Sequence, residues 1–273
     1  MIFRVLDIET VPDDTVWTKG DPSYRLAPST VEVASVVALP VDPFPPPHAC
    51  RVVAVSYVDV VMDPAKESRY YFDRYYSECL WSTDGGRSPS QSRADAAERR
   101  LLATFSVSML DPAITLVTWN GRCFDLPVIS MRSLGHKIAC GWYYKNRDVR
   151  YRFSEDGHLD LMDFLGDYGA CRNMRLGDLA RLCGLPGKTD MSGDKVDVLY
   201  TEAQRDPSRS EELQAKVARY CLQDSLQTAF IFLRTRFHLG KIDALTHNLA
   251  LGTFRKSPSV TDAIDLDWDR LLL

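Results

Sequence analysis

Apolar residues dominate the start of the chain, where residues 2–8 have the pattern of a buried β-strand. A β-branched run at 51–61 and a shorter one at 69–73 predict two more strands, separated by a Met-Asp-Pro-Ala turn. Residues 11–50 lack periodicity and end in a proline-rich stretch, which cannot form a central strand. We therefore expect a surface loop between the first two strands.

Further along the chain, the spacing of apolar residues becomes typical of helices instead of strands. Apolar positions recur at helical intervals from Ala94 to Met109, and Asp111-Pro112 closes that segment. The same criteria predict one more strand and three more helices: a strand at 114–119, and helices at 124–135, 176–183 and 211–239. Serine, glycine and proline at 82–93 predict a flexible loop. The order strand, strand, strand, helix, strand indicates an α/β fold with helices packed on a mixed sheet.

Length and composition suit a globular protein with a sizeable core. The chain has 273 residues, of which 45% are hydrophobic. We expect one domain over residues 1–240, followed by a C-terminal helix or polar tail over 241–273 whose role is open. Lys and Arg total 33 against 37 Asp and Glu, a net charge of −4. This balance argues against holding nucleic acid by bulk electrostatics, but a nuclease that gathers acids around metal can be acidic overall.

The cysteines and the apolar segments indicate the cellular compartment of the protein. The seven cysteines are odd in number, lack Cys-x-x-Cys spacing and lie mostly in apolar segments, so we expect reduced core residues. The N-terminus has no positively charged start followed by an apolar run, and no apolar segment approaches the roughly 20 residues that span a bilayer. These features predict a cytoplasmic protein with no membrane partner.

Two carboxylates interrupt the first strand. Asp7 and Glu9 are two positions apart, so on a strand they point the same way, while Leu6 and Ile8 point into the opposite layer. An unpaired carboxylate in a low-dielectric interior costs several kcal/mol. Such a pair therefore stays solvated, shares a proton or holds a hard cation. A divalent metal ion is the sharpest of these interpretations.

Two further clusters contain acids in unexpected surroundings. Asp125 follows Asn120 and Phe124 where a strand gives way to a turn and a helix start, which puts it near a sheet edge. Its alternative role is a helix N-cap. Tyr220 and Asp224 are four residues apart on a long helix and share one face, within the apolar stripe. The alternatives are a boundary carboxylate that reaches water and a packed helical tyrosine.

Taken together, the three clusters match a known pattern in order and spacing. The chain resembles the metal-dependent 3′-5′ exonucleases of the DEDD superfamily, with Asp7-Ile8-Glu9-Thr10 similar to the first motif, Asn120-x-x-x-Phe124-Asp125 to the second and Tyr220-x-x-x-Asp224 to the third. A tyrosine four residues before the last aspartate places it with the tyrosine-bearing (DEDDy) branch. Within that branch it is similar to predicted exonucleases related to the proofreading domain of family B DNA polymerases. The likeness runs over most of residues 1–236, with supporting phrases at 51–55, 158–162, 185–188 and 190–193.

The resemblance implies a ribonuclease H-like fold, a mixed five-stranded sheet flanked by helices, with the acids at one edge. It also implies two divalent ions, Mg²⁺ or Mn²⁺, which suit oxygen ligands; no His or Cys set has zinc spacing. By resemblance, Asp7 bridges both metals, Glu9 and Asp224 complete the site that activates water, and Asp125 holds the second metal. Tyr220 would orient that water, because a phenol with a pKa of about 10 stays protonated at neutral pH.

Candidate substrate contacts carry weaker signals. The expected substrate is the 3′ end of single-stranded DNA, with Thr10 facing the terminal nucleotide. Asn120 and Phe124 would meet the strand, although Phe124 suits the core equally well. Arg122 and Lys188 are candidate phosphate contacts, whereas a lysine in a Pro-Gly-Lys turn is more often simply solvated. Asp160 and Asp163 suit structural or capping roles, and Asp160 could support the metal ligands.

Several alternatives remain open at this point. An exoribonuclease acting on RNA 3′ ends shares the motifs, and a non-catalytic nucleic-acid-binding module shares the fold. A metal-dependent endonuclease of the wider ribonuclease H-like group is a third possibility, which the Tyr-x-x-x-Asp helix disfavours. We expect no polymerase domain in cis, because the sequence stops soon after the third motif. Protein partners are unknown.

Overall fold

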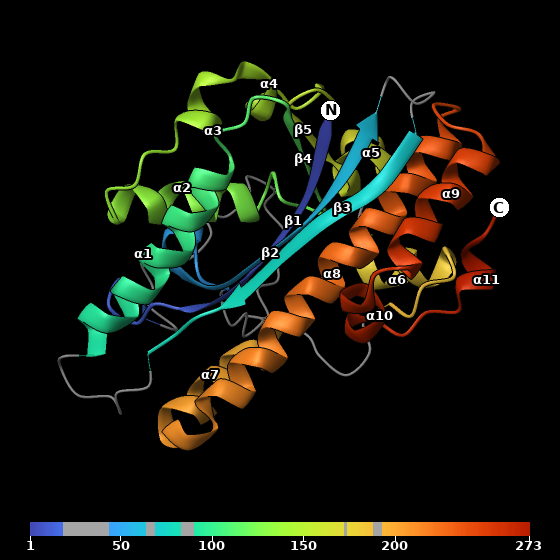
Figure 1. Cartoon of the computed structure of the whole chain (residues 1–273). Coiled ribbons are helices and arrows are strands. Elements are labelled where there is room, and N and C mark those ends of the chain that lie inside the picture. The colour runs from blue at the N-terminus through green and yellow to red at the C-terminus, as the bar shows by residue number, and fades with distance from the viewer. Residues whose placement is uncertain (19–43, 64–68, 83–89, 172–173, 188–192) are drawn as a thin grey trace, which may run out of the picture.

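A mixed β-sheet forms the centre of the molecule (Figure 1), as seen in a computed structural model that describes residues 1–18, 44–63, 69–82, 90–171, 174–187 and 193–273. Within these ranges the sheet has five strands: β1 (Ile2–Pro12), β2 (Cys50–Asp63), β3 (Arg69–Cys79), β4 (Ile114–Thr118) and β5 (His158–Asp160). Their order is β3-β2-β1-β4-β5. The β1–β2 and β2–β3 pairs are antiparallel, whereas β1–β4 and β4–β5 are parallel. This is the ribonuclease H-like arrangement, so the predicted fold class is confirmed.

Helices cover both faces of the sheet (Figure 1). Helices α1 (Ser90–Ser108) and α2 (Asp125–Gly135) lie on one face, and α8 (Ser210–His238) and α9 (Ala244–Arg255) lie on the other. The other helices of the described chain are α3 (Gly141–Lys145), α4 (Arg147–Arg150), α5 (Leu161–Leu165), α6 (Leu176–Leu182), α7 (Gly193–Arg205), α10 (Pro258–Ala263) and α11 (Trp268–Leu271). Each face of the sheet therefore has its own hydrophobic layer.

The central strand β1 distributes its side chains between these layers. Leu6 and Ile8 pack with residues of α1 and α2, whereas Phe3 and Val5 pack with residues of α8. This alternation is what the period of a strand demands, and the predicted opposition of Leu6 and Ile8 to the neighbouring acids holds. β1 also pairs with strands on both sides, which satisfies its backbone groups within the core.

The predicted elements agree with the structure except at their ends. β1 runs to Pro12 and β3 to Cys79, past the predicted limits of 8 and 73, because each continues to pair with β2. α1 begins at Ser90, inside the predicted loop 82–93, where polar residues gave no helical period. The short strand β5 and helix α7 had not been assigned from periodicity. Within the predicted 11–50 loop, a short 3₁₀ turn forms at Pro47–Ala49. Residues 19–43 of that loop lie outside the described residues.

The C-terminal segment contributes to the same core. Phe254 of α9 packs on Phe72 of β3 and on Phe230 of α8, with ring centroids 5.0 Å apart in both pairs. Val260, Ile264 and other buried residues beyond 240 join that cluster. The ambiguous tail is thus largely helical and packed, while the division at residue 240 stays a prediction. Across the described residues, no helix combines the length and apolarity that crossing a membrane requires.

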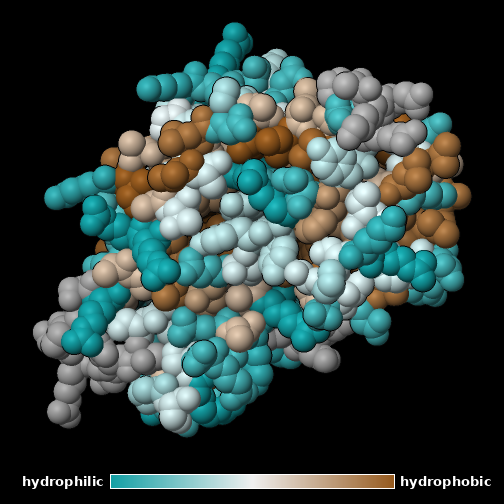
Figure 2. Space-filling view, in the orientation of Figure 1, coloured by the Kyte–Doolittle hydropathy of each residue, from teal (hydrophilic) through white to brown (hydrophobic). Residues whose placement is uncertain are grey.

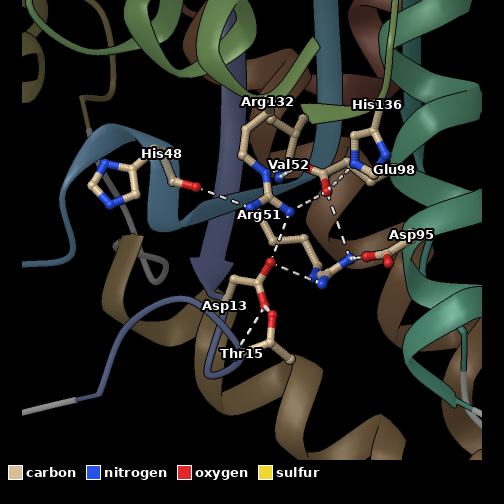
Figure 3. A network of polar contacts seen from close by, with 9 residues as sticks. All are labelled: Asp13, Thr15, His48, Arg51, Val52, Asp95, Glu98, Arg132 and His136. Atoms are coloured by element: carbon tan, nitrogen blue, oxygen red, sulfur yellow. Dashed lines mark hydrogen bonds and ion pairs between the residues drawn. The ribbon is translucent and has the colours of Figure 1, made fainter. Parts of the chain in front are cut away.

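A buried polar network ties the sheet to the helices on the α1 and α2 face. Glu98 of α1 accepts from Arg132 Nε of α2 at 2.7 Å and from the Val52 backbone N–H at 2.9 Å. Arg132 and Arg51 both pair with Asp13, at 2.8 and 3.0 Å. Figure 3 shows these groups converging from α1, α2, the end of β1 and the start of β2. Burial acts to raise the pKa of Glu98, but its hydrogen bonds to Arg132 and His136 outweigh this and hold that pKa below its usual range.

We predict that Glu98→Gln destabilises the protein by about 3 kcal/mol at pH 7, because it leaves two buried arginines with Asp13 as their one shared buried carboxylate. Urea unfolding measures this loss. The lowered pKa gives the sign of its pH dependence: the difference from the wild type is complete above the unfolded-state pKa of about 4.3 and shrinks as pH falls below it.

The matched control is Asp95→Asn, one turn earlier on α1. Asp95 also pairs with Arg51, at 2.8 Å, but its side chain is 40% exposed. Its removal should cost less than about 1 kcal/mol, as exposed pairs do. Equal effects of the two substitutions would contradict a special role for the buried charge.

Candidate active site

The predicted acids meet at a cleft of about 410 Å³ beside β1 and β4. Its described lining is mixed, with acids, aromatic rings and methionines: Asp7, Ile8, Glu9, Trp119, Asn120, Phe124, Asp125, Met162, Met174, Arg175, Leu176, Tyr220 and Asp224. These residues come from β1, the β4–α2 connection, the α5 and α6 region and α8. The cleft is therefore assembled from segments that are far apart in the sequence.

Asp7 and Glu9 reach this cleft from β1. Asp7 is partly exposed, whereas Glu9 is buried. A carboxylate oxygen of each lies within 4.8 Å of the other and of the Cys221 sulfur. The Cys221 thiol contacts the Asp7 carbonyl at 3.4 Å and Asp7 Oδ2 at 3.5 Å. Because burial and the neighbouring acids raise the pKa of Cys221 well above its usual range, the thiol stays protonated and acts as a donor.

Asp125 joins them from the first turn of α2. Its carboxylate accepts the Ile8 backbone N–H at 3.2 Å. The ladder between β1 and β4 ends at Val5 and Val117, so Asp125 takes over as a partner for β1 beyond that point. The N-cap of α2 is Phe124, which makes no side-chain capping bond. The alternative interpretation of Asp125 as an N-cap is therefore wrong: its side chain points to the strand.

The surroundings of Asp125 disfavour its charged form. Burial, together with the charge of Asp160, raises the pKa of Asp125 to about 7, although the hydrogen bond from Ile8 acts in the opposite direction. Its side chain is almost completely inaccessible to solvent. A cation in the cleft would offset this cost, since an opposite charge favours the ionised carboxylate.

Tyr220 and Asp224 enter the cleft one turn apart on α8. Their side chains are hydrogen-bonded to each other, as the four-residue spacing on a helix allows. Both residues are only 4% exposed, so Asp224 is not a boundary acid that reaches water. Burial, and next the charges of Asp224, Glu9 and Asp7, raise the pKa of Tyr220 far above its usual range. The phenol therefore stays neutral and can donate a hydrogen bond.

Asp160 fixes the connection that carries Asn120 and Asp125. Its carboxylate accepts the backbone N–H groups of Asn120 and Arg122, both at 2.9 Å, and also caps α5 through Met162 N at 3.1 Å. Asn120 takes a left-handed φ of 65°. At the next position, Gly121, a Cβ atom would lie 2.5 Å from Thr118 Cβ, so only glycine fits this turn. The predicted capping role of Asp160 is confirmed.

The candidate substrate contacts occupy different places. Asn120 and Phe124 line the cleft, and the Phe124 ring also meets Phe44 at 5.7 Å. Thr10 is not among the described lining residues, and its side chain hydrogen-bonds Cys50. Arg122 donates to backbone carbonyls, and Lys188 lies outside the described residues. Their roles toward a substrate stay predictions.

Several cleft residues had no signal in the sequence analysis. Met174 and Arg175 belong to no motif, and Met162, which lies within the supporting phrase 158–162, was not assigned a role. Cys221 follows the tyrosine of the third motif, but periodicity does not show that its thiol meets Asp7. A helical position next to a catalytic candidate was the only available hint.

The donor set fits a hard divalent cation. Asp7, Glu9, Asp125 and Asp224 offer only carboxylate oxygens, which Mg²⁺ and Mn²⁺ prefer. A second group of possible ligands, Asp95, Glu98 and His136, lies in the network of Figure 3. There the arginines already supply positive charge, so that group does not call for a metal ion.

No curated protein matches the chain. Among solved structures, the family B DNA polymerase from the hyperthermophilic archaeon Pyrobaculum calidifontis is similar at 14% identity and a TM-score of 0.46, over 96% of this chain and 27% of that chain. The chain thus spans about a quarter of that polymerase.

A family model gives a more specific result. The model described as a predicted 3′-5′ exonuclease related to the exonuclease domain of PolB matches residues 42–259. This range contains Asp125, Tyr220 and Asp224, whereas Asp7 and Glu9 precede it. Because the match covers well over half of the chain, the protein belongs to this family of predicted 3′-5′ exonucleases related to the exonuclease domain of PolB.

Proposed function

We propose that the protein is a metal-dependent 3′-5′ exonuclease that hydrolyses phosphodiester bonds at the 3′ end of single-stranded DNA. The observation that carries this proposal is the meeting of Asp7, Glu9, Asp125, Tyr220 and Asp224 in one cleft. The strand β1 and the helices α2 and α8 each supply part of the set, and about a hundred residues separate each element from the next. Family membership supports the reaction class.

In this proposal the four carboxylates would hold two divalent ions. Asp7, Glu9, Asp125 and Asp224 are the side chains that would hold these ions, and Asp7 would be the central ligand. Bound Mg²⁺ or Mn²⁺ supplies positive charge that makes water more acidic and neutralises charge developing on the phosphate. Because burial raises the pKa of Asp125, a cation bound nearby would favour the ionised form that a metal ligand needs.

Tyr220 and the cleft walls would position the reactants. The neutral phenol, hydrogen-bonded to Asp224, can hold a water molecule in line with the scissile phosphate. Trp119 and Phe124 offer ring faces to a terminal base, while Asn120 and Arg175 offer polar donors to the sugar and phosphate. A terminal nucleotide can therefore be oriented by this chain's own side chains.

The direct test uses a 5′-fluorescein single-stranded DNA 20-mer. With Mg²⁺ we expect a ladder that shortens from the 3′ end, and no products in EDTA. An RNA 20-mer of the same sequence and a circular DNA strand are the comparison substrates. Faster digestion of the RNA would replace the DNA assignment with an exoribonuclease, and cutting of the circle would identify an endonuclease.

Removing a proposed metal ligand should slow turnover severely. Asp7→Asn should lower kcat/KM by about a thousandfold, because charge stabilisation by bound metal contributes several kcal/mol to the barrier. The matched control is Asp262→Asn on α10, an exposed acid that is not among the residues lining the cleft. Retained activity in Asp7→Asn would remove this residue from the metal site.

Tyr220→Phe should slow hydrolysis by about 100-fold, since misplacing a reacting group by about 1 Å has an effect of that size. Metal binding should persist because the four carboxylates remain. Single-turnover rates measure the first effect, and the Mg²⁺-induced rise in Tm measures the second. An unchanged rate would exclude the phenol from the reaction.

Asp125→Asn should stabilise the metal-free protein at alkaline pH. Because the folded-state pKa is raised, wild-type stability is lost as pH rises from about 4 towards 7. The variant lacks this loss, so in EDTA it should be more stable than the wild type at pH 8, by at most about 4 kcal/mol, and similar at pH 4.

Adding Mg²⁺ should reverse that order, since the variant has lost a metal ligand. Thermal unfolding at both pH values, with and without Mg²⁺, measures both effects. Lower stability of Asp125→Asn in EDTA at pH 8 would show that the carboxylate serves packing instead.

A further inference from the structure

Exposed aromatic rings gather in one short segment, residues 144–153. Tyr144, Tyr151 and Phe153 are 57%, 47% and 56% exposed. Within the described residues, the large exposed aromatic side chains are these three together with Phe44 and Tyr75. Leaving large rings in water forgoes the burial that usually stabilises them. A cluster of three within ten residues therefore suggests a surface that binds something flat and apolar.

The same segment is strongly basic. It contains Lys145, Arg147, Arg150 and Arg152 but only one acid, Asp148, in a chain whose net charge is −4. The Arg147 guanidinium lies 5.5 Å from the Tyr151 ring centre, and that of Arg150 lies 5.2 Å from Tyr144. Neither Arg147 nor Arg150 has a carboxylate partner among the residues that the structure describes. Their charge is therefore available to an anion.

The scaffold beneath the segment holds these groups in place. Val149 is buried, and Trp142 packs edge-on against Phe105 of α1 at 5.6 Å. The Tyr144 hydroxyl lies 2.6 Å from Ser130 Oγ of α2, which fixes the orientation of its ring. Figure 1 shows α3 and α4 beyond the end of the sheet, and Figure 2 shows hydrophilic side chains projecting there. The surface is thus presented by packed elements.

Two polar links join this segment to the cleft wall. Arg122 lies between the cleft residues Asn120 and Phe124, and its Nη1 donates to the Arg150 carbonyl at 3.2 Å. Arg152 pairs with Asp163, at 2.6 Å, next to the cleft residue Met162. Residues 144–153 therefore adjoin the side of the cleft that the β4–α2 connection forms.

We propose that residues 144–153 form a track that binds the single DNA strand upstream of the 3′-terminal nucleotide. Binding a single strand without sequence preference needs ring faces for bases and cations for the backbone, and the track offers both. Its position beside the cleft lets one strand occupy both surfaces. The inference rests on the proposed exonuclease function and adds how a longer substrate is held.

The first test measures binding without catalysis. Fluorescence anisotropy of a labelled DNA 20-mer in EDTA compares the wild-type chain with Tyr151→Ala/Phe153→Ala. The Kd should rise at least about tenfold, because each stacked base contributes substantially to affinity. The control is Tyr75→Ala, which removes an exposed ring from β3 and should leave the Kd unchanged. An unchanged Kd in the double variant, with its fold intact by circular dichroism, would overturn the proposal.

The second test addresses the arginines of the track. All its substitutions are at exposed positions, so the core is unchanged. For Arg147→Gln/Arg150→Gln, the slope of log Kd against log salt concentration should decrease by about 1.4, or about 0.7 for each phosphate of the single strand that an arginine no longer neutralises. Arg99→Gln/Arg205→Gln neutralises two exposed arginines on α1 and α7 and should keep the wild-type slope. Equal slopes in all three proteins would contradict phosphate binding at the track.

Kinetics separate this proposal from the exonuclease assignment. In the aromatic double variant, the ratio of kcat/KM for the 20-mer to that for a trinucleotide should fall about tenfold, since the variant cannot stack bases beyond the terminal nucleotide. A ratio like that of the wild type would count against the track even if the enzyme is active. If no substrate is hydrolysed, the proposed function fails, while the anisotropy result still decides whether the track binds DNA.

Discussion

The repulsion among carboxylates gathered in one cleft is the constraint on which the arrangement of this protein depends. Asp7, Glu9, Asp125 and Asp224 would separate if the backbone allowed it, because like charges in a poorly hydrated site disfavour each other. Three elements prevent this. β1 is locked between two strands, α2 is bonded to it through Asp125 and the Ile8 N–H, and α8 packs its apolar side against the same sheet. The fold's burial energy therefore holds in place a site that is unfavourable by itself.

The network around Glu98 shows how different a balanced acid cluster looks. Its carboxylate is at least as buried as those of the cleft, but Arg132 and His136 bond to it directly and Arg51 lies 3.5 Å away. There the pKa is lowered, whereas that of Asp125 is raised. The network around Glu98 stabilises the junction of α1, α2 and the sheet, whereas the acids of the cleft concentrate negative charge. This contrast in compensation, rather than the number of acids, distinguishes a structural cluster from a candidate metal site.

The net charge of −4 conceals an uneven distribution of charge over the surface. The chain is acidic overall and has an acidic cleft, yet residues 144–153 combine arginines with exposed rings beside that cleft. An anionic strand approaching the carboxylates needs favourable contacts nearby to offset their repulsion. A basic aromatic surface next to an acidic cleft meets this requirement. In the proposed enzyme, binding and chemistry thus fall to neighbouring surfaces of opposite charge.

The sequence by itself determined strands β1 to β4, helices α1, α2, α6 and α8, and the three motifs, because periodicity and motif spacing are local properties. It indicated that Asp7 and Glu9 share one side of β1 and that Tyr220 and Asp224 share one side of α8. Only the tertiary structure decided that Asp125 bonds to Ile8 instead of capping α2, that Cys221 contacts Asp7, and that Glu98 is neutralised by distant arginines. It also decided which rings of residues 144–153 stay exposed. Burial and pairing depend on residues brought together from remote parts of the chain, and a local pattern does not contain that information.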